Sequence, residues 1–193
     1  EIDEDAGTLR IPEKGMLIGL GGIAKGYALD RAGEALRARG VDSFNLSAGG
    51  QVLTAGLAHR EGEAPRPWRV GIRDPRGGAE DFFASVEVLD ASISTSGDYE
   101  RFFTLDGERY HHILDLRTGQ PARVARSATV ICAEATLADA LSTVLMVLGP
   151  EGLGLIEEMA CEGVVVDAQG GIHRSVGLAD GLKVRHPPWS RRP

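Results

Sequence analysis

Apolar residues follow two different spacings along the chain, and the two spacings predict both helices and strands. Helical spacing occurs over 23–39, ahead of a capping glycine at Gly40. The apolar face predicted for this helix comprises Ala24, Ala28, Ala32, Ala35 and Leu36. A second helix is predicted to begin near Thr136 and to end at Gly149, and a short third helix follows from Pro150 to about Met159.

Short runs rich in β-branched and aromatic residues predict strands between and after these helices. The predicted strands are 16–18, 41–46, 52–53, 68–73, 82–88, 99–104, 110–114, 127–132, 164–166 and 172–175. Turn signals at Gly49-Gly50, Asp106-Gly107 and Gly170-Gly171 join neighbouring runs into hairpins. The expected fold class is α+β, with antiparallel sheets and packed helices in a single domain over 1–186 and a flexible tail over 187–193.

Composition narrows the classes of protein that remain. The chain has 193 residues, 42% of them hydrophobic, and a formal net charge of -7, which argues against nucleic acid as a partner. No apolar run approaches the length of about 20 residues needed to span a bilayer, so no membrane-spanning segment is expected. Cys132 and Cys161 could form a disulfide or remain two thiols, and their apolar neighbours favour two buried thiols.

A glycine-rich turn opens the first helix. Gly19, Gly21 and Ala24 fit the G-x-G-x-x-A pattern, in which glycines let a phosphate approach the N-terminus of a helix, and Lys25 adds a cation. A plain tight turn explains the same residues. An NAD-type dinucleotide-binding domain is a further alternative, but hairpins after residue 46 replace the strand–helix units that it requires.

Hydroxyl and imidazole groups gather in the next segment. Ser94, Thr95 and Ser96 stand in a row, while His111 and His112 are adjacent and would face opposite sides of a strand. A neutral imidazole can accept a proton from an attacking hydroxyl, which makes His112 a candidate catalytic base, although a structural histidine is the simpler alternative. The nucleophile pattern G-x-S-x-G is absent, so a Ser/His/Asp hydrolase is not favoured.

The second predicted helix carries three oxygen-bearing side chains on one face. Asp139, Ser142 and Thr143 are spaced i, i+3 and i+4, and all offer the hard oxygen ligands that Mg²⁺ prefers. One carboxylate holds Mg²⁺ weakly, so substrate phosphates would have to complete the site. The competing interpretation is a capping box from Thr136 to Asp139.

Three segments together resemble the ApbE family of FAD:protein FMN transferases. The matching stretches are GLGGIAKGYALDRAGEALRARGV with LSAGG, STSGDYERFFTLDGERYHHILDLRTGQP, and SATVICAEATLADALSTVLMVLG, within residues 19–149. The resemblance implies an ApbE-like fold, related to the T-fold. It also implies Mg²⁺-dependent transfer of FMN from FAD to a Ser or Thr hydroxyl of an acceptor protein, with release of AMP, in the bacterial cell envelope or periplasm.

The resemblance also assigns roles to individual residues. It implies that Gly19, Lys25 and Leu114 contact FAD, and that His112 assists catalysis. The metal ligands that it implies are Gly22, through its carbonyl, with Asp139, Ser142 and Thr143.

The chain departs from the family pattern at three places. Gly19 stands where the family has an aspartate that binds FAD, and Leu116 stands where it has proline. Family members also carry a longer segment before the glycine motif, so the chain is expected to be N-terminally short. The alternative function is therefore a homologue that binds flavin or nucleotide without transferring it.

Overall fold

The structure is a computed structural model that describes residues 1–186. It confirms the expected α+β class, with antiparallel sheets and helices packed on them. The tail predicted over 187–193 lies outside the described residues.

A six-stranded antiparallel sheet forms the centre of the molecule, in the order β14-β13-β12-β7-β4-β3. Its strands are β3 (Phe44–Ala48), β4 (Gln51–Ala55), β7 (Ser92–Gly97), β12 (Ala125–Cys132), β13 (Glu162–Asp167) and β14 (Ile172–Arg174). Side chains alternate between its two faces: Val165 packs on the face that carries the helices, whereas Val164 and Val166 pack on the face covered by a smaller sheet.

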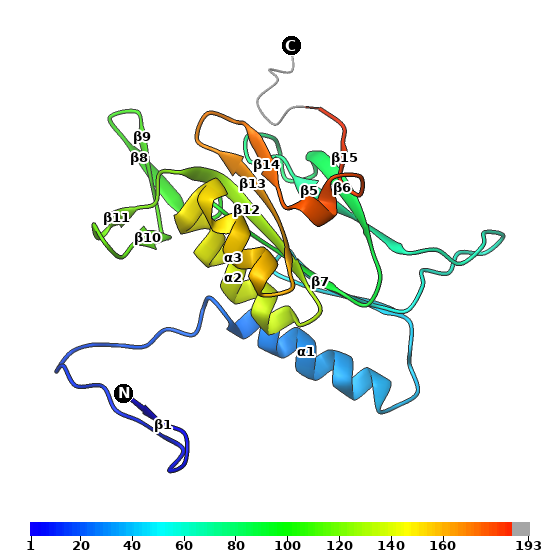
Figure 1. Cartoon of the computed structure of the whole chain (residues 1–193), viewed down its shortest axis with the longest axis horizontal. Helices are drawn as coiled ribbons and strands as arrows, with labels where there is room; N and C mark the ends of the chain where they lie inside the picture. Colours follow the sequence, from blue (N-terminus) through cyan, green and yellow to red (C-terminus); the bar gives the residue numbers. More distant parts are fainter. Residues whose placement is uncertain (187–193) are drawn as a thin grey trace.

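Helices cover one face of this sheet and a small sheet covers the other (Figure 1). The helices are α1 (Ala24–Arg37), α2 (Ala135–Leu148), the 3-10 turn η1 (Gly149–Gly152) and α3 (Leu153–Glu158). The small sheet has the order β15-β6-β5, with β5 (Trp68–Arg73), β6 (Phe82–Val88) and β15 (Lys183–Val184). The molecule thus has three layers with an apolar core on each side of the central sheet.

Three short hairpins lie outside these layers. They are β1 (Ile2–Asp3) with β2 (Thr8–Leu9), β8 (Phe102–Leu105) with β9 (Glu108–His111), and β10 (Leu114–Asp115) with β11 (Gln120–Pro121). The β8–β9 hairpin extends away from the body of the molecule (Figure 1). A final 3-10 turn, η2, spans Val176–Leu178.

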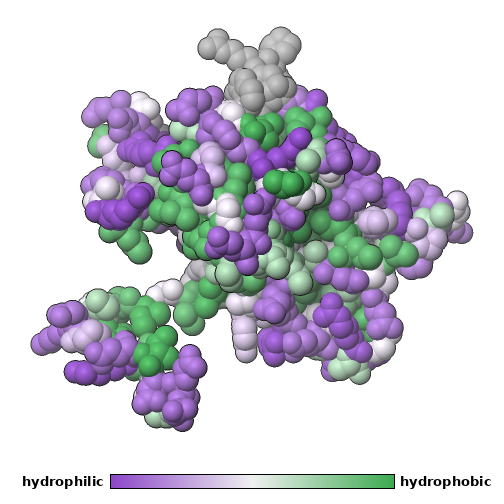
Figure 2. Space-filling model, in the orientation of Figure 1, coloured by the Kyte–Doolittle hydropathy of each residue, from purple (hydrophilic) through white to green (hydrophobic). Residues whose placement is uncertain are grey.

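The segment before α1 stands apart from the rest of the chain. Residues 1–24 are all exposed, and the segment forms a separate lobe with both polar and apolar surface (Figure 2). The strand expected over 16–18 is wrong, because these residues pair with no other strand of the described chain. An apolar run becomes a strand only where a partner supplies the hydrogen bonds of its backbone.

Helix α1 has its expected position but buries a different face. Ala24, Ala28, Ala32 and Ala35 are exposed, which makes that part of the expectation wrong. The buried residues are Gly26, Leu29 and Gly33. A Cβ on Gly26 would lie 2.2 Å from the carbonyl oxygen of Ala135, so α1 packs against the first turn of α2 where only glycine fits.

Strand β7 was not predicted, although it lies at the centre of the sheet. Its residues, Ser92 to Gly97, are mostly hydroxyl-bearing and lack the apolar alternation of a typical strand. Ser94 and Ser96 find partners on α2, and Thr95 bonds Thr129 of β12 on the opposite side. Polar side chains are tolerated there because each one forms hydrogen bonds.

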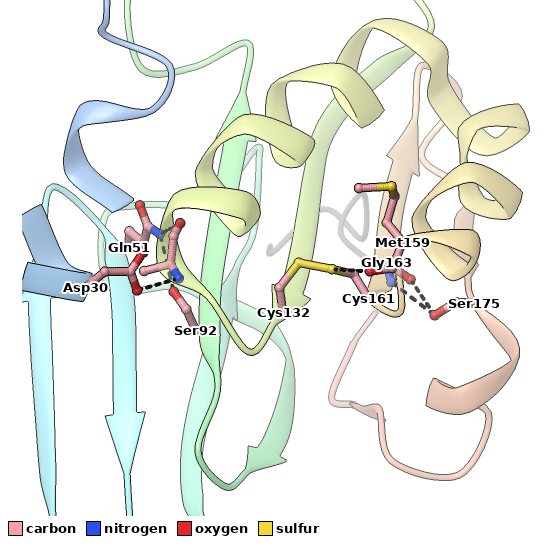
Figure 3. Close-up of a disulfide and its surroundings, with 9 residues drawn as sticks. Asp30, Gln51, Ser92, Cys132, Met159, Cys161, Gly163 and Ser175 are labelled. Carbon is pink, nitrogen blue, oxygen red and sulfur yellow. Dashed lines mark hydrogen bonds between the residues drawn. A yellow bond between two sulfur atoms is a disulfide. The ribbon is translucent and has the colours of Figure 1, made fainter. Parts of the chain in front are cut away.

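The two cysteines form a disulfide, so the expectation of two buried thiols is wrong. Cys132 ends β12 and Cys161 precedes β13, with Cα atoms 4.7 Å apart on neighbouring antiparallel strands (Figure 3). Apolar neighbours did not distinguish the two states, because a buried disulfide has the same surroundings as a buried thiol.

One helical stretch, Ala135–Glu158, satisfies the length and apolar composition of a membrane span. Its α2 part supplies Ala138, Leu145 and Met146 to the core, where all three are fully buried. Packing against the central sheet therefore accounts for its apolar character.

Candidate active site

A buried carboxylate and four hydroxyl groups cluster where α2 crosses β7. The hydroxyl of Ser96 lies 2.9 Å from that of Ser142 and 3.3 Å from that of Thr143. The hydroxyl of Ser94 lies 3.3 Å from Ser142 and 3.5 Å from Oδ1 of Asp139. The i, i+3, i+4 face predicted for α2 therefore meets a matching row of hydroxyls on the strand below it.

Helix α1 supplies the counter-charge for this cluster. Lys25 Nζ lies 2.8 Å from Oδ1 of Asp139, and the backbone N–H of Gly26 donates to Oδ2 at 3.1 Å. The Asp139 side chain is 3% exposed, whereas that of Lys25 is 40% exposed. The buried carboxylate is thus ion-paired and hydrogen-bonded, and the lysine above it borders solvent. We call Lys25, Ser94, Ser96, Asp139, Ser142 and Thr143 the Asp139 cluster.

Asp139 does not act as the N-cap partner of α2. The carboxylate of Asp30, from α1, accepts hydrogen bonds from the backbone N–H groups of Ala135 and Thr136 at 2.9 and 2.8 Å, and from the Thr136 hydroxyl. Asp30 lies beside the start of α2 in Figure 3. The capping-box alternative is therefore wrong. Asp30 of α1 caps α2, and the Asp139 carboxylate instead forms an ion pair with Lys25.

A buried amide holds the same turn from the strand side. Gln51 Nε2 donates to the carbonyl of Ala135 at 2.7 Å and lies 3.2 Å from the Ser92 hydroxyl (Figure 3). Asp30 and Gln51 together fix the turn that begins α2, one turn before Asp139. Neither was a predicted site residue, because each acts on a segment distant in sequence.

The glycine motif is only partly drawn into the cluster. A Cβ on Gly22 would lie 4.0 Å from the hydroxyl oxygen of Thr143, which places Gly22 at the edge of the cluster. A Cβ on Gly19 would have no atom within 4 Å. Gly49, in the left-handed region with φ 54°, lies against the stem of Lys25, so the turn between β3 and β4 also borders the site.

His111 and His112 face opposite ways, as expected. His111 is buried with Nε2 2.8 Å from the Ala122 carbonyl, and burial lowers the pKa of its imidazole. His112 is exposed, and its Nδ1 lies 3.4 Å from the carbonyl of Arg101. Within residues 1–186, His112 makes no hydrogen bond with the Asp139 cluster, and Leu114 is likewise exposed at the start of β10.

The oxygen donors fit a hard divalent cation. Asp139, Ser142 and Thr143 present a carboxylate and two hydroxyls, and the Cβ position of Gly22 lies 4.0 Å from the Thr143 hydroxyl oxygen. No cluster of three or more His, Cys, Asp or Glu occurs in the described part of the chain. Carboxylate and hydroxyl oxygens are the donor types that Mg²⁺ takes, with phosphate oxygens and water completing its coordination.

Comparisons with known proteins show the family to which the chain belongs. The sequence model of the ApbE family matches residues 1–165. An FAD:protein FMN transferase from Treponema pallidum (strain Nichols) is 38% identical over 184 residues, covering 92% of this chain and 51% of the relative. Another from Rhodobacter capsulatus is 40% identical over 144 residues, which is 75% of this chain and 26% of the relative.

Solved structures give the same result. The ApbE protein from Thermotoga maritima superposes with a TM-score of 0.81 at 38% identity, covering 92% of this chain and 57% of that one. The apo flavinyl transferase ApbE of Pseudomonas stutzeri gives a TM-score of 0.61 at 38% identity, covering 82% of this chain and 48% of that one. The chain spans about half the length of the Treponema relative. On the family match and these identities, the chain belongs to the ApbE family.

Proposed function

We propose that this chain carries the metal- and phosphate-binding part of an FAD:protein FMN transferase. In this reaction a Ser or Thr hydroxyl of an acceptor protein attacks the FMN phosphorus of FAD. The new bond is a phosphoester, the bond to the AMP phosphate breaks, and AMP leaves. The observation that supports the proposal most directly is the Asp139 cluster, in a family whose curated relatives carry this name.

The chain's own residues have separable tasks in this proposal. Lys25 sits at the start of α1, 40% exposed, where its ammonium and the helix N-terminus favour a pyrophosphate. Asp139, Ser142, Thr143 and the Gly22 carbonyl would hold Mg²⁺, which supplies positive charge to the pyrophosphate when bound. Because Asp139 pairs with Lys25 here, we propose that Lys25 turns from the carboxylate toward phosphate oxygens in the loaded state.

His112 is the proposed acceptor of the hydroxyl proton. Its imidazole is exposed, and its Nε2 makes no hydrogen bond in the portion of the chain described by the structure. An acceptor protein could therefore approach it from solvent. The Leu114 backbone, two residues further on, is proposed to contact FAD on the same side.

The experiment combines the 193-residue chain with FAD, Mg²⁺ and a flavin-acceptor domain, and detects covalent flavin by in-gel fluorescence. We expect Asp139→Asn to abolish the product, because it removes the carboxylate of the proposed metal site. Asp180→Asn is the matched control, since Asp180 is exposed and outside the site. A folded chain that yields no fluorescent product would contradict the transferase proposal.

The alternative, binding without transfer, draws support from Gly19, which replaces a family carboxylate and whose Cβ position has no atom within 4 Å. Thermal unfolding with FAD and Mg²⁺ separates the two functions. Ligand at a hundred times its Kd adds about 2.7 kcal/mol to the free energy of unfolding. A thermal shift without covalent product would favour the binding-only homologue.

We also propose a cell-envelope location, which the disulfide between Cys132 and Cys161 supports because such bonds persist in oxidising compartments. Thiol alkylation of the protein taken from its own cells tests this. Rapid labelling of both cysteines without reductant would contradict the proposal.

A further inference from the structure

A polar cavity lined by none of the Asp139-cluster residues lies at the base of the β8–β9 hairpin. It measures about 180 Å³ and is bordered by the start of β12, the end of β9 and the loop between β5 and β6. Four arginines line it: Arg76, Arg109, Arg123 and Arg126. One carboxylate, Asp98, is the only acidic group in this lining, so positive charge dominates the cavity.

Asp98 orients two of the four guanidinium groups. It accepts two hydrogen bonds from Arg76, both at 2.7 Å, and one from Arg109 Nη1 at 3.0 Å. Asp98 is 8% exposed, so its single charge is shared between two cations in a largely buried place. Stacking of the Arg109 guanidinium over Phe102, 4.1 Å from the ring centroid, fixes Arg109 further.

Arg126 is the cation that lacks a carboxylate. Its Nε and Nη2 both donate to the carbonyl of Ala168, at 3.1 and 2.8 Å, and it forms no ion pair within residues 1–186. Its Nη1 makes no hydrogen bond there either. A guanidinium that has an open nitrogen and no carboxylate partner can donate a charge-assisted hydrogen bond to an anion in the cavity.

Charge counting indicates what kind of anion fits. Four arginines and one aspartate leave a formal charge of three, and Arg123 is offset by Glu108, which lies 3.2 Å away outside the lining. The remaining charge of two matches a dianion better than a carboxylate. The unengaged Nε and Nη2 of Arg109 form a planar fork of the kind that binds phosphate oxygens in pairs, and Nη1 of Arg126 adds one further donor.

We propose that this cavity binds a phosphate group, at a site separate from the Mg²⁺ and pyrophosphate site. The two sites share no residue, because the proposed metal ligands come from α2 and the glycine motif. The phosphate belongs either to free inorganic phosphate or to a nucleotide monophosphate such as AMP. The proposal does not depend on the transferase activity.

The test titrates inorganic phosphate into the full chain in the presence of EDTA, at constant ionic strength, with binding followed by calorimetry. We expect saturable binding that weakens at least tenfold in Arg126→Met and Arg109→Met. Arg69→Met is the matched control, since it removes the same charge from exposed β5, and Asp139→Asn checks that the other site is not the one measured. Both should bind as the unsubstituted chain does.

NMR on the unsubstituted chain tests the proposal even if an arginine variant fails to fold. In the unsubstituted chain, phosphate should shift the Nε–Hε NMR signals of Arg109 and Arg126 and leave that of Arg69 in place. Equal response to acetate and phosphate, or unchanged affinity in the arginine variants, would overturn the proposal. Tighter binding of AMP than of phosphate assigns the site to a nucleotide, and equal or weaker binding assigns it to the free ion.

Discussion

Gly26 lies where α1 meets the first turn of α2, and replacing it with alanine tests whether this contact positions the candidate site. The added Cβ would lie 2.2 Å from the carbonyl oxygen of Ala135 and 2.6 Å from Cα of Thr136. Both are backbone atoms, so rotation of a side chain cannot relieve the overlap. The two helices must separate.

The expected loss combines three effects. Overpacking of a closely fitted contact costs about 1–3 kcal/mol. Separation also lengthens the 3.1 Å hydrogen bond from the Gly26 N–H to Asp139, and a bond to a charged group contributes about 1.5–3 kcal/mol. Alanine favours the helix by about 1 kcal/mol over glycine, which opposes the other two effects. We expect the free energy of unfolding to fall by about 2–4 kcal/mol.

Urea unfolding followed by far-UV circular dichroism measures this change. Gly33→Ala is the matched control in the same helix, because the three atoms nearest to its Cβ are side-chain atoms, among them Leu53 Cδ2 at 3.0 Å and Phe44 Cζ at 3.4 Å. Those side chains can move, so the control should lose about 1 kcal/mol or less. If Gly26→Ala is as stable as Gly33→Ala, the close helix contact is not what positions Asp139.

Three further predictions concern the support of the site. In urea unfolding, Asp30→Ala should lower the free energy of unfolding by about 2 kcal/mol, because the first N–H groups of α2 lose their acceptor. Asp30→Asn keeps an oxygen acceptor and should lose less, so equal losses in the two variants would refute the capping role. Reduction of the disulfide, which joins residues 29 positions apart, should lower the free energy of unfolding by roughly 3–4 kcal/mol. The control is a Cys132→Ala/Cys161→Ala chain, whose stability reductant should leave unaffected. An unchanged urea midpoint of the native chain on reduction would show that the disulfide does not stabilise the fold. Burial lowers the pKa of His111 below its usual 6.5, so only the unfolded chain takes up that proton as the pH falls through 6.5. Stability should therefore decline below that pH, and His111→Gln should flatten the decline in denaturation curves from pH 8 to pH 5; an equally steep decline would assign it to other groups.

Much of the local structure follows from the sequence alone. The ranges of β5 and β6 agree with the runs predicted over 68–73 and 82–88, and α2 begins and ends within a residue of its predicted bounds. The turn at Asp106-Gly107 has both residues at positive φ, as its sequence indicates. Periodicity and turn residues act over a few positions, and these features depend on nothing farther away.

The oxygen-bearing face of the site was predictable for the same reason. Asp139, Ser142 and Thr143 lie on one side of α2 because their spacing fits a helical turn. The sequence did not indicate that the hydroxyls of Ser94 and Ser96 would meet them. That contact depends on β7, a strand without apolar alternation, taking a place at the centre of the sheet.

Only the tertiary structure decided what surrounds that face. Lys25 and Asp139 are 114 positions apart, and Asp30 reaches the start of α2 across more than a hundred residues. Two of the three buried residues of α1 are glycines, and hydrophobicity could not reveal them because they fit by having no side chain. Such contacts depend on which elements pack against one another. The residue pattern of one segment does not specify which surface will pack on it.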